Sequence, residues 1–382
     1  MSKGDVAAAA FFARAWVRPE ETLAVAALGH GLINQTWRVT TSGGYVFVLQ
    51  RLSRTIFPRP EHIQSNIRQL HDAAIESDGV LQLPRLLACQ HDADTDHVLE
   101  GDAAVWRALS YIQGGHSLHS LASSCQAVRA GELLGRFHER VSGLAPERFL
   151  DTLPGFHVAP AYYAELMMAA AAAPGLASLS EVRRMLDFVW RRRALIGVLE
   201  SARLAGLLTE RIIHGDPKLD NMLFHAETRE PLAMVDLDTV KPGLVHYDIA
   251  DCLRSACNRR GELSDTVAVG FDLDIAMAIM DGYLRVAGRW LTPMDRILLV
   301  PAVVLLPLEL GMRFLSDHLR GDVYFRVDAP GQNLARAAVQ FALVSSIESM
   351  LPELRRGIGR LLQTLAPIRS VAGASLGFPV IP

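Results

Sequence analysis

The sequence predicts an α+β protein with two lobes, a small lobe rich in strands followed by a larger lobe made mainly of helices. Short runs of β-forming residues alternate with glycine turns up to residue 112. The sequence Gln113-Gly114-Gly115 then interrupts this pattern, because consecutive glycines mark a turn. From there on, apolar residues recur at helical spacing. We therefore place the two lobes at residues 1–112 and 113–382.

The first lobe is expected to contain a helix, a three-stranded meander, a second helix and a hairpin. Residues 6–13 are apolar and predict an amphipathic first helix, since Asp5 spoils the basic start of a cleaved leader. Five strands are expected, three in the meander and two in the hairpin: 24–28, 36–40, 45–50, 97–100 and 104–109. The second helix follows Pro60 and has one apolar face: Ile63, Ile67, Leu70 and Ala74.

The second lobe is expected to be helical apart from one segment. One apolar stripe at helical spacing opens it: Val128, Leu134, Phe137 and Val141. Long helical stretches follow: 160–205, 265–290 and 295–320. Only residues 211–238 are typical of strands and loops. Because a cleft between two lobes is a usual place for a small-molecule site, this plan predicts a ligand between them.

Composition argues against several classes of partner. The net charge of the 382 residues is −3, so the broad basic surface of a nucleic-acid-binding protein is not expected. The four cysteines form no Cys-x-x-Cys pair, which predicts reduced thiols in a cytoplasmic protein without a zinc site. The longest apolar runs, 166–177 and 297–308, fall short of the roughly 20 residues that cross a bilayer. We expect a monomer or weak homodimer without nucleic-acid or membrane partners.

The strongest chemical signal is residues 214–221, which read His-Gly-Asp-Pro-Lys-Leu-Asp-Asn. Phosphoryl transfer needs an aligned hydroxyl, a proton acceptor and metal ions that neutralise the phosphates. Asp216 and Asn221 have the Asp-to-Asn spacing of protein-kinase catalytic loops. Asp236 ends the apolar run 233–235, and a hairpin would bring it beside Asn221. Magnesium prefers such oxygen ligands, so the sequence predicts one magnesium site here.

The same residues also have simpler interpretations. An aspartate before proline is common in turns, and Asp220-Asn221 could cap a helix. The ordered pair of motifs, each preceded by an apolar strand, favours the functional interpretation. His214 is expected to fix the loop rather than act as a base. Asp238 is assigned to the metal site, with capping as the alternative, and Lys218 either neutralises phosphate charge or is solvated.

Two further segments are expected to contact a nucleotide. Gly29, Gly31 and Asn34 belong to the turn between the first two strands, where glycine lets backbone amides approach a phosphate, although tight hairpins also need glycine. At the hinge, the backbone of Ser110 and Ile112 is expected to bind the base.

These motifs resemble the aminoglycoside phosphotransferase and choline kinase family, which has a protein-kinase-like fold. The helix after the hinge carries Leu-Gly-Arg-Phe-His at 134–138, as in that family. Longer segments are similar to the N-acetylhexosamine 1-kinase branch and are spread between residues 28 and 325. They are 31–37, 49–52, 235–243, 248–254 and 309–315.

The resemblance implies a kinase that uses ATP and Mg²⁺ to phosphorylate the anomeric hydroxyl of N-acetylglucosamine or N-acetylgalactosamine. It implies that Asp216 is the catalytic base and that Asn221 and Asp236 hold magnesium. It also implies that Arg313 and Tyr324 contact the sugar. Without the resemblance, an arginine on a helix would be interpreted as a surface or salt-bridge residue.

Two departures from the family pattern keep alternatives open. Gln50 stands where many members carry a phosphate-binding lysine, with Arg51 beside it, and strand alternation lets only one of them serve. Leu32 stands where the branch often has histidine, which bears on the identity of the sugar. The alternatives are an aminoglycoside, choline or homoserine kinase of the same fold, or a nucleotide-binding pseudokinase.

Overall fold

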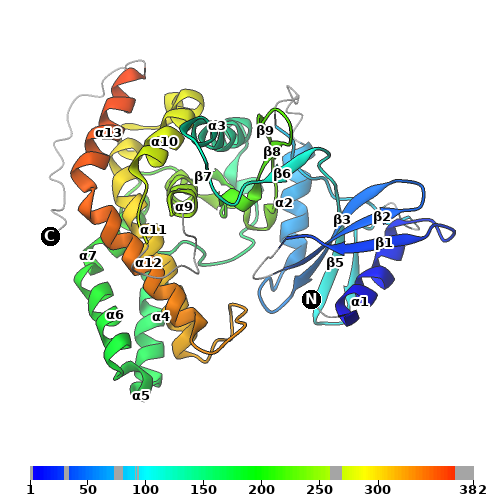
Figure 1. The fold of residues 1–382 in the computed structure, drawn as a ribbon, viewed down its shortest axis with the longest axis horizontal. Helices are drawn as coiled ribbons and strands as arrows, with labels where there is room; N and C mark the ends of the chain where they lie inside the picture. The colour runs from blue at the N-terminus through cyan, green and yellow to red at the C-terminus, as the bar shows by residue number, and fades with distance from the viewer. Residues whose placement is uncertain are drawn as a thin grey trace.

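The structure is a computed structural model that describes residues 3–29, 34–72, 81–90, 92, 94–258 and 269–365. Figure 1 shows a small lobe that holds the main sheet on one side and a larger lobe of helices on the other. The α+β architecture predicted from the sequence is therefore confirmed.

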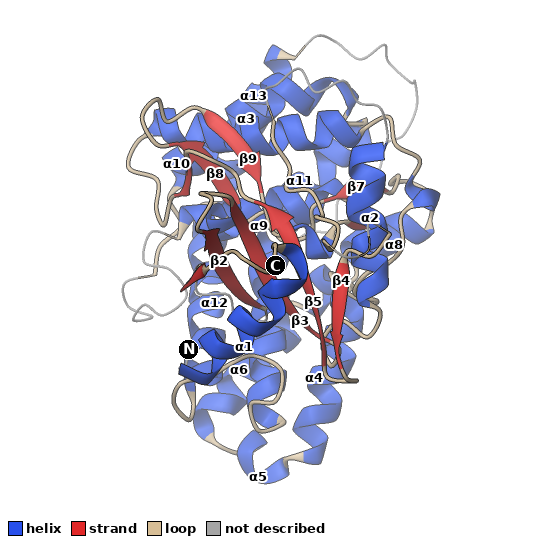
Figure 2. Cartoon of the chain, turned by 90° about the vertical axis from the view of Figure 1, so that its right-hand side faces the viewer, coloured by secondary structure: helices blue, strands red, loops and turns tan. Residues whose placement is uncertain are grey.

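The small lobe is built on a five-stranded antiparallel sheet in the order β1-β2-β3-β5-β4. Its strands are β1 (Leu23–Ala27), β2 (Gln35–Thr41), β3 (Val46–Ser53), β4 (His97–Glu100) and β5 (Ala104–Ser110). All five correspond to predicted strands, with small shifts at the ends. Helix α1 (Lys3–Ala13) lies across one face of the sheet, where Phe12 stacks on Trp106 with ring centroids 4.6 Å apart (Figure 2).

Helix α2 (Pro60–Asp72) ties the small lobe to the large one. It buries the predicted residues Ile63, Ile67 and Leu70, while Ala74 lies outside the described residues. The buried side chain of Asn66 donates hydrogen bonds to the carbonyls of Leu150, at 2.7 Å, and Val240, at 2.8 Å. These bonds satisfy two backbone acceptors of the large lobe and fix the helix against it.

The large lobe begins with α3 (Ser124–Val141), which packs against α10 (Leu273–Ala287). A Cβ added at Gly131 would lie 1.9 Å from the carbonyl oxygen of Ile279, and one added at Gly282 would lie 2.0 Å from that of Val128. Glycine at both positions therefore allows the two helix backbones to touch. Of the apolar stripe predicted from the sequence, Leu134, Phe137 and Val141 are buried, whereas Val128 is only partly buried.

Further helices complete the large lobe. They are α4 (Ala159–Ala172), α5 (Pro174–Ala177), α6 (Ser180–Arg191), α7 (Arg193–Ile196), α8 (Val198–Leu204), α9 (Val245–Cys257), α11 (Pro293–Leu319), α12 (Gln332–Ser349) and α13 (Leu351–Thr364). Among the described residues, α11 is long and apolar enough to cross a membrane, as is the bent pair of α12 and α13 taken together. However, 78% of the most apolar window of α11 is buried inside the fold, as is usual for a core helix.

Two small antiparallel sheets lie at the junction of the lobes. One pairs β7 (Arg211–Ile213) with β10 (Lys241–Gly243). The other has β8 (Met222–His225) between β6 (Gly115–Ser117) and β9 (Pro231–Met234). These strands are the only ones that the structure describes after β5. β7, β8 and β9 lie within the break in helical pattern predicted for 211–238, whereas β6 and β10 lie outside it and were not predicted. The loops at their ends hold the candidate active site.

Candidate active site

The loop that carries Asp216 is anchored by a buried strand and shaped by a glycine. Ile212 and Ile213 of β7 are buried, which fixes the start of the loop. Gly215 follows with φ +84°, and a Cβ there would lie 2.6 Å from the carbonyl oxygen of Thr239. Only glycine fits this conformation and this space. The side chain of Asp216, which is 27% exposed, leaves the loop directly after it.

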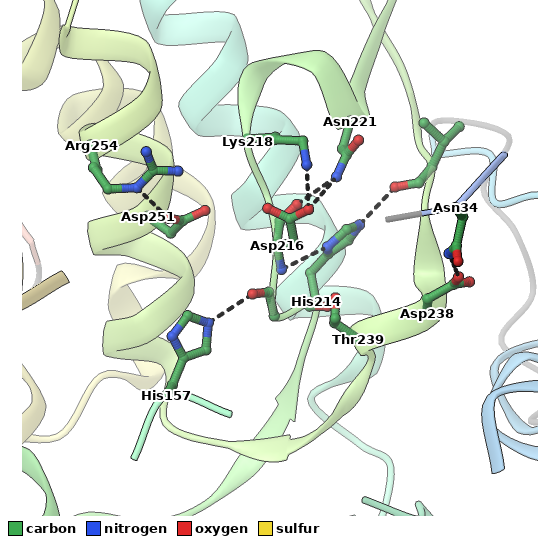
Figure 3. A network of polar contacts seen from close by, with 12 residues as sticks. Asn34, His157, His214, Asp216, Lys218, Asn221, Asp238, Thr239, Asp251 and Arg254 are labelled. Atoms are coloured by element: carbon green, nitrogen blue, oxygen red, sulfur yellow. Dashed lines mark hydrogen bonds and ion pairs between the residues drawn. The ribbon is translucent and has the colours of Figure 1, made fainter. Parts of the chain in front are cut away.

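Lys218 and Asn221 converge on the carboxylate of Asp216 (Figure 3). The ammonium of Lys218 donates to Oδ2 at 2.6 Å, and the amide nitrogen of Asn221 donates to the same oxygen at 3.2 Å. Burial alone would raise the pKa of Asp216, but Lys218, together with the charges of His214 and Arg254, outweighs this effect and holds the pKa below its usual value. Asp216 is therefore an ionised hydrogen-bond acceptor at neutral pH.

The β8–β9 hairpin brings Asn221 and Asp236 to the same end, as predicted. The N–H of Val235 donates to the carbonyl of Asn221 at 2.9 Å, which joins the two segments. The amide nitrogen of Asn221 also donates to the carbonyl of Asp216 at 2.8 Å. Its orientation is thus fixed by two acceptors, which leaves the amide oxygen for a cation.

Asp236 has properties that suit a metal ligand. Its φ of +63° places it in the left-handed region, which is uncommon for a residue other than glycine and is often retained at functional sites. Burial, followed by the charges of Asp238 and Asp216, raises its pKa to about 7. A divalent cation bound by this carboxylate and by the oxygen of Asn221 would relieve the excess negative charge. The two residues therefore fit magnesium, which prefers oxygen ligands.

We expect Asp236→Asn to stabilise the metal-free protein, on the order of 1–3 kcal/mol above pH 7. Folding raises the pKa of the Asp236 carboxyl from 3.8 to about 7, so the folded state binds the carboxyl proton more tightly than the unfolded state does. The wild type therefore loses stability as the pH rises between these two values. Asparagine does not titrate, so the variant does not lose this stability. The gain should thus grow from pH 4 to 7 and level off above, as measured by urea unfolding in EDTA. A pH-independent difference would contradict the raised pKa.

A buried aspartate on α9 holds the backbone of the Asp216 loop. Asp248 accepts the N–H of His214 at 2.7 Å and that of Gly215 at 2.8 Å. Its Oδ2 is also 2.8 Å from Nε2 of His138 on α3, whose other ring nitrogen is 3.0 Å from the hydroxyl of Tyr283. Sequence reasoning missed these supporting roles. A charged residue in an otherwise buried helix is the signal that could have revealed Asp248.

His214 has the structural role expected from the sequence. Its side chain is fully buried, and burial lowers its pKa, so the ring is neutral at pH 7. Its Nε2 lies 3.0 Å from the carbonyl of Val235, and its Nδ1 accepts the N–H of Asp216 at 3.4 Å. The ring therefore connects the Asp216 loop to the strand that precedes Asp236.

A second polar network joins the small lobe to the segment after Asp236. Both oxygens of Asp238 are occupied, one by the guanidinium of Arg107 on β5 and the other by the side-chain amide of Asn34 at 2.6 Å. Oε1 of Gln50 on β3 accepts from Arg107 at 2.7 and 3.1 Å. Asp236 is thus better placed than Asp238 to bind a metal. Nothing in the local sequence indicates the role of Arg107.

The two neighbouring residues of β3 point to opposite faces, as strand alternation requires. Gln50 faces the junction of the lobes, whereas Arg51 pairs with Glu100 at 2.6 Å on the other side. Of the two residues considered in place of the family lysine, Gln50 alone therefore reaches the site.

The other expected nucleotide contacts are only partly described. Gly29 has φ +75° at the end of β1, which agrees with a turn, while Gly31 and Leu32 lie outside the described residues. At the hinge, the N–H of Ser110 donates to the carbonyl of Arg85 at 2.8 Å and is not free for a base. A contact of the base with the backbone of Ser110 and Ile112 stays a prediction, and for Ser110 it would use the carbonyl.

Arg313 and Tyr324 lie together, close to the Asp216 loop. Four aromatic rings surround the guanidinium, with centroids 5.1–5.8 Å from its central carbon: Phe156, Tyr162, Tyr324 and Phe325. The ring of Phe156 also lies 3.9 Å from that of His157. Nε2 of His157 is 2.8 Å from the carbonyl of Gly215, the residue before Asp216. These contacts place the aromatic cluster beside the candidate catalytic loop.

Asp317 orders the loop that carries Tyr324. One of its oxygens accepts the N–H of Val323 and of Tyr324, at 3.0 and 2.8 Å, and the other accepts that of Phe325 at 2.9 Å. Asn333 donates to the second oxygen at 2.9 Å. The two rings on this loop are therefore held in place by a buried carboxylate.

An Asp-to-Asn loop, an aspartate-tipped hairpin and a sheet lobe above them define the class of a phosphotransferase with a protein-kinase-like fold. The model of the phosphotransferase enzyme family that includes the aminoglycoside phosphotransferases matches residues 24–285, and the chain belongs to this family. The resemblance at this level is confirmed.

Solved structures with the same fold support this assignment. A microcompartment-associated aminopropanol kinase has a TM-score of 0.64 at 18% identity, covering 91% of this chain and 98% of its own. An aminoglycoside phosphotransferase from Alicyclobacillus acidocaldarius has a TM-score of 0.56 at 18% identity, covering 94% and 97%. An amicoumacin kinase, solved with AMP-PNP and Ca²⁺, has a TM-score of 0.53 at 13% identity, covering 95% and 94%. The chain is thus a small-molecule kinase by family and fold.

Proposed function

We propose that this protein uses ATP and Mg²⁺ to phosphorylate the anomeric hydroxyl of an N-acetylhexosamine, GlcNAc or GalNAc, giving the sugar 1-phosphate. The observation that carries the choice of acceptor is Arg313, a cation held among aromatic rings beside the Asp216 loop. Aromatic faces pack against the apolar side of a sugar ring, and a guanidinium donates hydrogen bonds to hydroxyl and acetamido oxygens.

The charge of Arg313 itself favours a neutral acceptor, because a guanidinium repels a cation such as choline or an aminoglycoside. Two buried carboxylates near the cluster are only half paired. Glu309 pairs with His157 at 2.9 Å and Asp251 pairs with Arg254 at 2.7 Å. Their other oxygens have no hydrogen-bond partner among the described residues, so the proposed preference for a neutral acceptor rests on Arg313 and not on these carboxylates.

The chemistry follows from the residues around Asp216. Asp216 binds the acceptor hydroxyl. The hydroxyl oxygen forms a bond to the γ-phosphorus of ATP, and the hydroxyl proton moves to the Asp216 carboxylate. ADP leaves with the electrons of the broken phosphoanhydride bond. Lys218, 2.6 Å from Asp216, keeps this carboxylate ionised before the reaction. Magnesium bound by Asn221 and Asp236 would neutralise charge on the phosphates.

A panel of acceptors tests the proposal. The purified protein is incubated with ATP, Mg²⁺ and each of GlcNAc, GalNAc, glucose, choline, homoserine and kanamycin, and the products are identified by ³¹P NMR. We expect phosphate on the anomeric oxygen of GlcNAc or GalNAc, with kcat/KM at least tenfold above that for the other compounds. A preference for choline, homoserine or kanamycin would overturn the choice of acceptor. ATP binding without turnover on any acceptor would support the pseudokinase alternative.

Arg313→Met is expected to lower kcat/KM for the sugar by about 10- to 100-fold, because a hydrogen bond to a charged group contributes about 1.5–3 kcal/mol. The KM for ATP should not change. The matched control is Arg320→Met, which removes an exposed arginine from the end of the same helix. Equal kcat/KM values for the two variants would show that Arg313 does not contact the acceptor.

The two lobes are proposed to have separate roles. We propose residues 1–112 as the nucleotide-binding lobe and 113–382 as the catalytic and acceptor-binding lobe. The protein is proposed to act in the cytoplasm as a monomer or weak homodimer. The intact set of Asp216, Asn221 and Asp236 supports an active kinase over a pseudokinase.

A further inference from the structure

Arg107 is a fully buried cation at the junction of the two lobes. Its side chain is 0% exposed, and its position on β5 is directly opposite Gln50 on β3 in the sheet register. The guanidinium bonds to Gln50 and to Asp238, two residues after Asp236. Arginine is rarely buried without paired charge, because removing a charge from water is costly.

The partners of Arg107 within the described chain do not use its full donor capacity. Its Nη1 is buried and has no hydrogen-bond partner among the described residues. The same is true of Oδ1 of Asn34, whose amide nitrogen binds Asp238 on the other side of the network. Each unmet buried donor or acceptor costs about 1–3 kcal/mol. Two of them around one ion pair point to a polar ligand at this place.

The other cations near this sheet are engaged elsewhere. Arg51 follows Gln50 on β3 but faces away, where it pairs with Glu100 and is 29% exposed. Lys218 belongs to the large lobe and contacts Asp216. Of the cations that the structure describes on β3 and β5, Arg107 is therefore the one that faces the segment carrying Asp236 and Asp238.

We propose that Arg107 supplies, from β5, the positive charge toward the nucleotide phosphates that a lysine on β3 supplies in many kinases, with Gln50 orienting its guanidinium. Arg107 lies on the strand next to the usual lysine position of β3 and faces the same side of the sheet as Gln50. Arginine suits this task, since its planar fork can bind a carboxylate and a phosphate oxygen at once. The inference rests on the ATP dependence proposed above but not on the choice of acceptor.

The test measures binding of ATP with Mg²⁺ by calorimetry, without any acceptor, so that a wrong sugar cannot affect the result. We expect Arg107→Met to weaken ATP binding at least tenfold. Arg51→Met, which removes the neighbouring cation, is the matched control and should bind like the wild type. Wild-type affinity in Arg107→Met would overturn the proposal.

A second set of variants separates a phosphate role from a structural one. Arg107→Met leaves Asp238 buried without its partner and could fail to fold, so Arg107→Met is combined with Asp238→Asn, which removes both charges. If Arg107 only balances Asp238, this double variant should bind ATP like the wild type, which would also overturn the proposal. If Arg107 serves the phosphates, the double variant stays at least tenfold weaker.

Adding a lysine at the position opposite Arg107 completes the experiment. Gln50→Lys in the double variant restores a cation on β3, and we expect it to recover most of the lost ATP affinity. If the added lysine does not improve ATP binding over the double variant, the idea that a cation on either β3 or β5 can serve the phosphates is contradicted. Recovery is not expected from a purely structural role, because the double variant has no carboxylate at position 238 for the added lysine to balance.

Discussion

Replacing Asp216 by alanine is expected to lower kcat by about 10³-fold or more, while the fold and ATP binding survive. Positioned acid–base groups contribute about 10²–10⁴-fold, and Asp216 additionally orients the acceptor hydroxyl. Its carboxylate is ionised because Lys218, with His214 and Arg254, outweighs the effect of burial on its pKa. The measurement is steady-state turnover of the best acceptor from the panel, with circular dichroism to confirm folding.

The control for Asp216 comes from the same loop. Asp220 is exposed and its carboxylate lies 3.1 Å from the ring of His119, away from the convergent groups. Asp220→Ala removes the same chemical group four residues later and should keep turnover within about twofold of the wild type. Retained turnover in Asp216→Ala would rule out the assignment of Asp216 as the base.

Asp248→Ala is expected to destabilise the protein by about 3 kcal/mol or more and to lower turnover as well. The substitution leaves two buried N–H groups, those of His214 and Gly215, and the ring of His138 without their acceptor. Each unsatisfied buried donor costs about 1–3 kcal/mol, so the loss of one acceptor shared by these groups sums to about 3 kcal/mol or more. Urea unfolding measures the change, and kinetics at low temperature measure the effect on the loop.

An exposed aspartate provides the comparison for this stability effect. Asp187 lies on the solvent face of α6, and Asp187→Ala should change stability by less than about 0.5 kcal/mol. Stability of Asp248→Ala within that range would show that the loop is held by other contacts. Asp216→Ala, in contrast, should lose turnover without comparable loss of stability, which separates the group that reacts from the group that positions it.

Local sequence patterns predicted most of the secondary structure. Alternating β-formers and glycine turns identified all five strands of the main sheet, because strand propensity and turn signals are local. The pairing of β3 with β5 is not local and had to come from the structure. The face of α2 was predicted from the spacing of Ile63, Ile67 and Leu70. Helices α12 and α13 lie in the lobe that was predicted to be helical, but their bounds were not predicted, and they pack on α11 and α10. Their apolar residues face a surface made by other helices, and the sequence does not show that surface.

The reactive groups of the candidate site could be predicted because they are close in sequence. Asp216 and Asn221 share one loop, and Asp236 follows within one hairpin. The groups that support them come from distant positions: His138 lies 110 residues from Asp248, and Arg107 lies 131 residues from Asp238. Such pairs have no local pattern. The bond between the N–H of Ser110 at the hinge and the carbonyl of Arg85 is another contact that no local pattern indicated.

The sequence by itself determined the reaction class, because neighbouring residues form both the catalytic loop with Asp216 and Asn221 and the hairpin that leads to Asp236. Only the tertiary structure decided which buried charges face the site: it turned Arg51 outward, placed Arg107 on Asp238 and surrounded Arg313 with aromatic rings. The physical reason is that burying a charge is favourable only where partners from other elements converge, and convergence is a property of packing rather than of local sequence.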